Sequence, residues 1–356
     1  MYSEFVCLQI VQCGLKFPYK IDATTVAARR FYKMEMRPYV ILDTNTLLKK
    51  FPVIHPTPVD TDMEKKIQNR LLCGFENWNR GFDAWKAWGD VLYTQGSIYN
   101  VHAVKLSLQG YQMAMNLTMK RNNILMGDFY NMVICDDWCG IHYAIATENK
   151  ETGVMVPGSV MEFVHFTDLG GDRGAVVDEG WAGTRGPDFD GLSRMQGPEH
   201  RGKQEEVNRA VLNAVIPETD DLTVKFPVTH PTAIKDALGM KIRDAILKDF
   251  DKWNQGAEIW CAWADEYFTP DYKYTFNEDV CTLEERKAKV ADYMAEKKDV
   301  RISFDSLLIS GDWAAIHYRM RITDEATGET IAADRMEFLH FVEDGDSVCV
   351  DASWMK

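Results

Sequence analysis

The sequence contains no long apolar run, no excess of basic residues and no closely paired cysteines. No segment approaches the roughly 18 consecutive apolar residues that span a bilayer, and the first residues lack the basic region and cleavage site of a secretory signal. Lys and Arg number 40 against 54 acidic residues, and the formal charge is -14. A field of that sign repels phosphate, so we expect neither a membrane nor a nucleic acid as partner.

The eight cysteines include no Cys-x-x-Cys pair. We therefore expect no structural zinc site, and reduced thiols are typical of a cytoplasmic protein. Glu162-x-x-His165 has a spacing that suits a metal on a helix, but on a strand these two residues face opposite sides. The sequence thus predicts a cytoplasmic protein with no metal.

An internal repeat is the strongest pattern in the 356 residues. The segment FPVIHPT begins at Phe51, and FPVTHPT begins 175 residues later at Phe226. The ten tryptophans fall into five pairs at nearly the same spacing, and MEFVHF at Met161 matches MEFLHF at Met336. The chain is therefore a duplicated domain.

The duplication predicts four segments. Residues 1–40 have no counterpart and are expected to form an N-terminal arm, and residues 184–215 are rich in glycine and charge, as expected of a linker. The repeated units are 41–183 and 216–356. In each, helical spacing comes first and alternating strands follow, which predicts an α+β domain with an antiparallel sheet. Thr282 with Glu285 has the capping-box pattern of a helix start.

Several motifs of the chain resemble one known family. These are a helical WN-x-G-(3)-W, present in both units, and, as the second unit has them, a strand with GDWAAIHY, a TGE turn and a closing F-x-x-DG-(n)-W hairpin. They are similar to the SnoaL-like polyketide cyclase group of the nuclear transport factor 2-like superfamily. The resemblance implies a tandem duplication of a conical barrel, in which a curved antiparallel sheet wraps three helices around a pocket. Members include cyclases, dehydratases, isomerases and hydrolases that use no cofactor, and also non-catalytic binding modules.

The last hairpin of each unit carries the candidate catalytic residues. A turn at residues 171–172 places His165 opposite Asp178, and a turn at 345–346 places His340 opposite Asp351. Opposed residues share a sheet face, and a carboxylate can orient an imidazole for proton transfer. The resemblance implies that this face lines the pocket, since the family's cyclases use a histidine and an aspartate of the last strands. A purely structural His–Asp bridge stays open as the alternative.

Aromatic residues are the candidates for substrate binding. They line either an apolar pocket for a ring system or simply the core: Trp85, Tyr93, Phe163, Trp260 and Phe338. The resemblance adds His102, which follows the first strand where related chains place a pocket residue. The second unit has Asn277 there, a difference that favours the first unit as the active one.

Two more pairs of residues bear on assembly and reaction type. The strand alternation puts His142 and His317 opposite the apolar face, so we expect them on outer sheet faces through which the units stack as an internal pseudo-dimer. A further homo-oligomer is left open. Related dehydratases carry an aspartate where this chain has Asn79 and Asn254, and an amide cannot act as a general base.

The sequence therefore predicts a cofactor-independent acid–base enzyme of the cyclase, isomerase or dehydratase type. Its partner would be a hydrophobic small molecule, a ring compound that bears a carbonyl group. The alternative is a non-catalytic small-molecule-binding or assembly module in which one or both pockets are inactive.

Overall fold

A computed structural model describes residues 51–184, apart from 102, 103 and 172, and residues 216–356, apart from 278, 296 and 325. The predicted N-terminal arm, residues 185–215 of the predicted linker, and His102 lie outside the described residues. None of the described helices is long and apolar enough to cross a membrane.

The first unit begins with a short strand, continues through helices and ends in long strands. In chain order its elements are β1 (Val53–Pro56), α4 (Asp62–Gly74), the 3₁₀ helix η1 (Phe75–Arg80), α5 (Phe82–Leu92), β2 (Tyr93–Val101), β3 (Val104–Ser107), α6 (Leu108–Arg121), β4 (Asn122–Cys135), β5 (Trp138–Asn149), β6 (Met155–Asp168) and β7 (Ala175–Thr184).

The second unit begins with one additional short helix and then repeats this order, except that one continuous helix replaces α4 and η1. Its elements are α9 (Leu222–Lys225), β8 (Val228–Pro231), α10 (Ala237–Gln255), α11 (Ala257–Tyr267), β9 (Phe268–Phe276), β10 (Asp279–Thr282), α12 (Leu283–Ala295), β11 (Lys297–Ser310), β12 (Trp313–Asp324), β13 (Thr330–Asp344) and β14 (Ser347–Met355).

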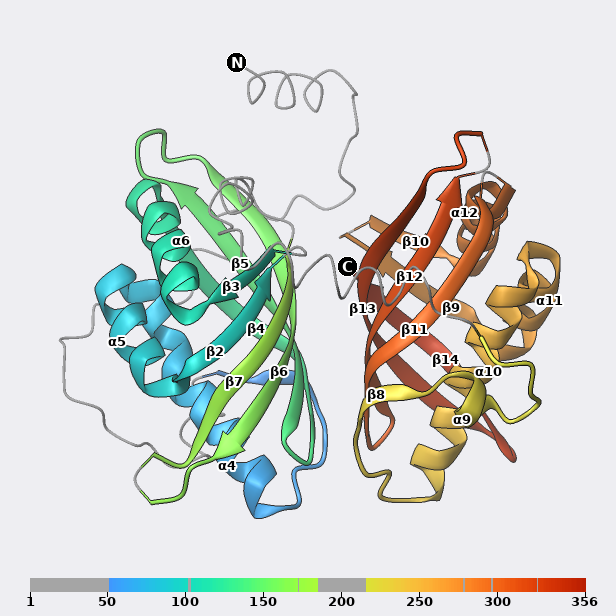
Figure 1. Cartoon of the computed structure of the whole chain (residues 1–356), viewed down its shortest axis with the longest axis horizontal. Helices are drawn as coiled ribbons and strands as arrows, with labels where there is room; N and C mark the ends of the chain where they lie inside the picture. The colour runs from blue at the N-terminus through green and yellow to red at the C-terminus, as the bar shows by residue number, and fades with distance from the viewer. Residues whose placement is uncertain are drawn as a thin grey trace. The chain divides into compact units, whose positions relative to one another are not determined.

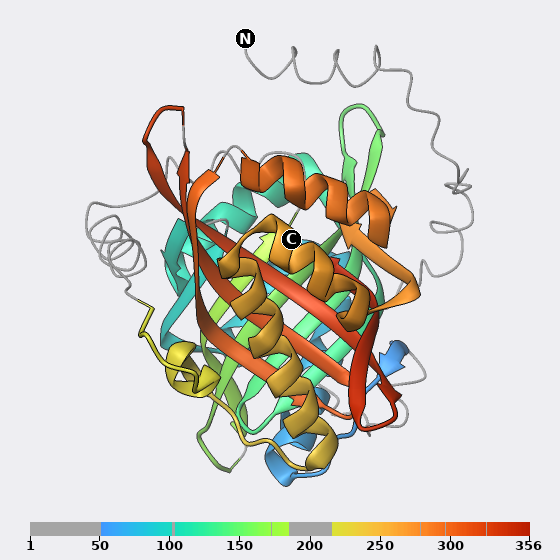
Figure 2. The same ribbon diagram turned by 90° about the vertical axis from the view of Figure 1, so that its right-hand side faces the viewer.

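Each unit forms one seven-stranded sheet with the same strand order (Figure 1). The first runs β1-β4-β5-β6-β7-β2-β3, and the second runs β8-β11-β12-β13-β14-β9-β10. The helices of each unit lie on one face of its sheet, as α10, α11 and α12 do in gold and orange in Figure 2. The predicted duplicated α+β fold is confirmed. The sheets are not wholly antiparallel, because β1 pairs with β4, and β2 with β7, in parallel.

Local capping sets the helix starts. Thr61 accepts a hydrogen bond from the backbone N–H of Glu64, and the Glu64 carboxylate accepts from the backbone N–H of Thr61. The predicted capping box at Thr282 and Glu285 forms the same reciprocal pair, with bonds of 3.3 and 2.8 Å. Each box satisfies two backbone donors that the first helical turn leaves unpaired.

Strand alternation gives each sheet an inner and an outer face. Along β5, Cys139, Ile141 and Tyr143 belong to the core that packs against the helices. Trp138 belongs to another cluster, which joins the outer faces of the two sheets. Its buried members are Val133, Cys135, Trp138, Met161, Phe163 and Trp181 from the first unit and Leu308, Trp313, Ala315, Met336 and Phe338 from the second.

The contacts between the outer faces are reciprocal. The ring of Trp138 lies 4.7 Å from that of His230, and the equivalent Trp313 lies 5.0 Å from His55. Equivalent residues also meet each other: the rings of Phe163 and Phe338 are 6.2 Å apart. This exchange of roles is the pattern of contacts across a two-fold axis.

A glycine allows the sheets to approach on this pseudo-axis. A Cβ atom on Gly140 would lie 2.8 Å from the Cβ of Ala315, its equivalent in the second unit. Because real Cβ contacts are longer, a larger residue at position 140 would push the two sheets apart.

Candidate functional site

The histidine–aspartate pair of the last hairpin forms in both units, although its register differs from the prediction. Nδ1 of His165 lies 2.5 Å from Oδ1 of Asp178. Phe166 pairs with Val177, but His165 pairs with Glu179, so Asp178 is the extra residue of a β-bulge. A bulge sets two residues against one on the neighbouring strand, which keeps the carboxylate within reach of the ring.

The second unit carries the same bulge and the same contact. His340 pairs with Ala352, Asp351 is the additional residue, and Nδ1 of His340 lies 2.6 Å from Oδ1 of Asp351. In each unit another aspartate lies 3.2 Å from Nε2 of the histidine, Asp137 in the first and Asp312 in the second. Both ring nitrogens therefore face carboxylates.

The prediction that this pair faces an enclosed pocket is wrong. On β6, Val164 and Phe166 point into the helix-facing core, so the alternating residues Phe163 and His165 point outward. Phe163 and Phe338, predicted to bind substrate, fill the contact between the sheets. The imidazole of His165 is 25% exposed at the margin of this contact.

The electrostatics of His165 follow from its acidic neighbours. The hydrogen bond to Asp178 raises the pKa of His165, burial opposes the rise, and Asp137 adds to it. Burial raises the pKa of Asp178, but hydrogen bonds from His165 and Thr167 outweigh it, and the net shift is downward. Both shifts thus favour the charged form of each group.

Trp85, Tyr93 and Trp260, which were predicted to bind substrate, lie in the helix-facing cores of their units. In the first unit the interior is aromatic. The rings of Tyr99 and Tyr111 stack at 4.6 Å, and Trp85 meets Tyr111 edge-on at 5.3 Å. The only acid of this interior among the described residues is Glu162, which accepts a 2.5 Å hydrogen bond from the hydroxyl of Tyr143.

Two glycines make room for these rings. A Cβ on Gly74 would lie 1.7 Å from Nε1 of Trp88, and a Cβ on Gly180 would lie 2.4 Å from the ring of Tyr99. Neither position can hold a larger side chain while the rings occupy these places.

The interior of the second unit is charged instead. Arg286 stands where the first unit has Tyr111, and its guanidinium lies 3.6 Å from Glu337 and 4.2 Å from the ring centre of Tyr274. Its Nη1 donates to the hydroxyl of Tyr272, which also shares a 2.5 Å hydrogen bond with Ser353. Arg286 and Glu337 are both buried. A charged group is expensive to bury unless it is paired, as these two are.

Asp249 is the most chemically distinctive member of this interior. It replaces Gly74, and its carboxylate accepts a 2.9 Å hydrogen bond from the indole N–H of Trp260. Burial raises the pKa of Asp249 to about 7, and the charge of Arg286 limits the rise. Such a carboxyl can both accept and donate a proton near neutral pH.

The sequence alone did not single out Asp249, Tyr272, Arg286 or Ser353. A signal was present in the internal alignment, because these positions hold Gly74, Ser97, Tyr111 and Gly180 in the first unit. Four coordinated differences between otherwise matching copies would have marked the second interior.

Comparison with known families agrees with this fold. Residues 250–350 match the family model of the SnoaL-like domain. This part of the second unit is a SnoaL-like domain. The first unit has the same strand order, so the prediction of two tandem copies is confirmed by the two seven-stranded sheets. A search of curated proteins finds no match.

Several solved structures resemble parts of the chain. AclR of Streptomyces galilaeus, described as a candidate hydroxylase, is 16% identical over 34% of this chain and 90% of its own, with a TM-score of 0.30. A candidate SnoaL-like polyketide cyclase from Jannaschia sp. CCS1 is 15% identical over 35% and 90%, with a TM-score of 0.31. IdmH of Streptomyces antibioticus, a candidate polyketide cyclase, is 16% identical over 32% and 89%, with a TM-score of 0.28.

The SnoaL-like unit thus holds a partly buried acid, a buried guanidinium and two hydroxyl groups within one interior. An acid with a pKa near 7 can remove a proton from carbon, and a guanidinium can stabilise the oxyanion that develops. These are the groups that cofactor-free acid–base chemistry requires.

Proposed function

We propose that the SnoaL-like unit catalyses cofactor-independent proton transfer on a hydrophobic ring compound that bears a carbonyl group. The reaction would be of the cyclase, isomerase or dehydratase type. The supporting observation is the replacement of Gly74 and Tyr111 of the first unit by Asp249 and Arg286 in the second. Because the first unit has the same strand order without these charges, the fold does not require them.

The proposed roles follow from the chemistry of each group. The carboxylate of Asp249 removes a proton from the carbon next to the carbonyl, and the C–H electron pair moves to form an enolate. Arg286 and the hydroxyl of Tyr272 stabilise the negative oxygen. Trp260 orients Asp249 through its indole N–H. Return of the proton to another carbon, or attack of the enolate on a second carbonyl, completes isomerisation or cyclisation.

For the first unit we propose an assembly role without catalysis. Its stacked tyrosines and Trp88 occupy the positions of the charged groups of the second unit. Its outer face supplies half of the contact between the sheets, as expected of one half of an internal pseudo-dimer. This differs from the sequence-based preference for the first unit, which depended on His102. A cytoplasmic location and a lack of nucleic-acid partners stay predictions.

Exchange of carbon-bound hydrogen tests the proposal without knowledge of the natural substrate. The full-length protein is incubated in D₂O with 2-tetralone, a ring ketone, and deuterium uptake next to the carbonyl is followed by mass spectrometry. We expect uptake above buffer, and a loss of about 100-fold or more in Asp249→Asn. Glu162→Gln, which changes the acid of the first interior, is the matched control and should exchange as the wild type does.

The same assay tests the catalytic role predicted for the outer histidines. Nε2 of His165 already faces Asp137, so the nitrogen that would move protons is engaged. We therefore expect His165→Ala and His340→Ala to retain exchange. Equal rates in wild type and Asp249→Asn, or loss of exchange in His165→Ala alone, would contradict the assignment to the second interior.

A further inference from the structure

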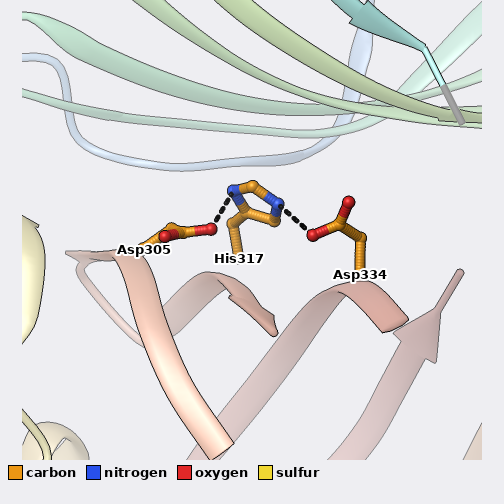
Figure 3. Close-up of side chains that lie close together, drawn as sticks. All are labelled: Asp305, His317 and Asp334. Atoms are coloured by element: carbon orange, nitrogen blue, oxygen red, sulfur yellow. Dashed lines mark ion pairs between the residues drawn. The ribbon is translucent and has the colours of Figure 1, made fainter. Parts of the chain in front are cut away.

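A second polar group lies outside the interior, on the outer face of the second sheet. Asp305 of β11, His317 of β12 and Asp334 of β13 stand side by side on neighbouring strands (Figure 3). Nδ1 of His317 is 3.6 Å from Oδ2 of Asp305, and Nε2 is 3.9 Å from Oδ1 of Asp334. One ligand atom from each residue lies within 4.8 Å of the other two.

The imidazole in this group is buried without hydrogen bonds. His317 is fully buried, and neither of its ring nitrogens has a hydrogen-bond partner among the described residues. The rings of Phe163 and Trp181 lie over it at 5.6 and 5.4 Å. A buried polar atom that stays unpaired is destabilising, so this arrangement favours a partner for the imidazole.

Two carboxylates of this group share one guanidinium. Asp305 and Asp334 both contact Arg319, at 2.8 and 3.2 Å. Glu179 of the first unit acts on Asp305 as a further negative charge, whereas Arg335 acts on Asp334 and Lys105 acts on Glu179 as positive charges. Among the groups in direct contact there is thus one more carboxylate than cation, which a bound metal ion would offset.

The first unit lacks the two acids. Its equivalents of Asp305, His317 and Asp334 are Tyr130, His142 and Ser159, and Arg319 corresponds to Ala144. The histidine is common to both copies, but the two carboxylates and the arginine occur only in the second. The strand order of the first unit again indicates that the fold does not need the added charges.

We propose that Asp305, His317 and Asp334 bind one first-row divalent metal ion at the contact between the two sheets. Two carboxylate oxygens and one imidazole nitrogen are a donor set that Zn²⁺ and its neighbours accept, and a water molecule would complete tetrahedral coordination.

Binding requires one ligand to move, because the two carboxylates face different ring nitrogens. Asp334 is suited to this, since its side chain is 31% exposed whereas that of Asp305 is 6% exposed. Each carboxylate has two oxygens and can keep one on Arg319 while offering the other to the metal. The exposed side of Asp334 also gives the ion a route in. The bound ion would stabilise the contact between the sheets and take no part in the interior chemistry.

Zinc retention by the full-length protein tests the site. The protein is treated with a chelator, loaded with Zn²⁺, dialysed at pH 7.5 and analysed by native mass spectrometry, with Co²⁺ absorption as a second probe of coordination. We expect one ion per wild-type chain and loss of that ion in Asp334→Asn. Asp334→Ser introduces the residue of the first unit and serves as a second variant should the amide disturb folding.

The partly exposed His165 of the first unit supplies the control. Asp137→Asn removes a carboxylate beside His165 and should leave zinc retention unchanged. The proposal is wrong if the wild type retains no zinc, or if Asp334→Asn and Asp334→Ser retain as much as the wild type. Loss of the ion in Asp137→Asn would also overturn it, because the metal would then lie at His165.

Discussion

The two units enclose chemically opposite interiors within the same strand order. In the first, Gly74 and Gly180 admit the rings of Trp88 and Tyr99, and a stack of tyrosines fills the space. In the second, Asp249 replaces Gly74 and Arg286 replaces Tyr111, and these two residues bring charge into the same region. The comparison shows that this fold specifies the shape of its interior but not its polarity. One copy can therefore serve as an internal control for the other.

The largest expected effect comes from removing the charge that distinguishes the second interior. Arg286→Met leaves the buried Glu337 without its cation, and breaking such a buried pair costs about 3–5 kcal/mol. Tyr111→Phe at the equivalent position removes only one hydroxyl, and we expect it to cost about 1 kcal/mol or less. Urea unfolding of both variants measures the difference. Similar losses of unfolding free energy in the two variants would contradict the proposed difference between the two interiors.

The pH dependence of stability should differ between two histidines on the outer face of the first sheet, His142 and His165. Burial, and then the charge of Lys356, lower the pKa of His142 to about 3. Its contribution to stability is therefore complete above pH 6.5 and is lost as the pH falls toward 3, by roughly 3 kcal/mol between pH 7 and 4. His142→Gln should flatten the acid side of a curve of unfolding free energy against pH. An unchanged acid slope would show that His142 is not buried as described.

A smaller effect separates the two equivalent tryptophans. The indole N–H of Trp260 donates to Asp249, whereas that of Trp85 has no hydrogen-bond partner among the described residues. Trp→Phe removes similar volume at both sites, but only Trp260→Phe takes a hydrogen-bond donor from a partly buried carboxylate. We expect Trp260→Phe to cost about 1–2 kcal/mol more than Trp85→Phe in thermal or urea unfolding. Equal costs would argue that Asp249 finds another donor.

The smallest effect concerns His165, whose shift is opposite in sign to that of His142. Its raised pKa means that the contact with Asp178 stabilises the protein fully below pH 6.5, and that this stabilisation is lost as the pH rises through the raised value. Because the ring is partly exposed, we expect His165→Gln to cost under about 1 kcal/mol. The loss should be largest below pH 6.5 and should diminish as the pH rises through the raised pKa. A loss that grows with pH would contradict the assigned charge state.

The sequence predicted much of the fold and only part of the site. The sequence alone predicted the repeat, the α+β class and the capping box at Thr282, because each depends on the spacing of residues along the chain. The meeting of His165 with Asp178 was predicted as well, but the bulge that makes Asp178 an extra residue was not. A bulge depends on how two strands pair, so the residue pattern of one strand does not predict it.

The orientation of the last hairpin could not be read from its own residues. Met161, Phe163 and Trp181 are as apolar as any core face, and here they meet a second sheet instead of the helices. Apolar residues indicate that a sheet face is buried, but they do not indicate whether helices or a second sheet cover it. For that reason the predicted substrate-binding residues Phe163 and Phe338 became contact residues, whereas Trp85 and Trp260 stayed inside.

By itself the sequence determined that the chain is a duplication, which residues correspond in the two copies, and where the copies differ in charge. Tertiary structure alone decided which of those differences converge. Asp249, Tyr272 and Arg286 lie on two helices and a strand, and Asp305, His317 and Asp334 lie on three strands. Charges interact over a few ångströms of space regardless of their separation along the chain, so only the folded arrangement turns scattered acids and bases into sites.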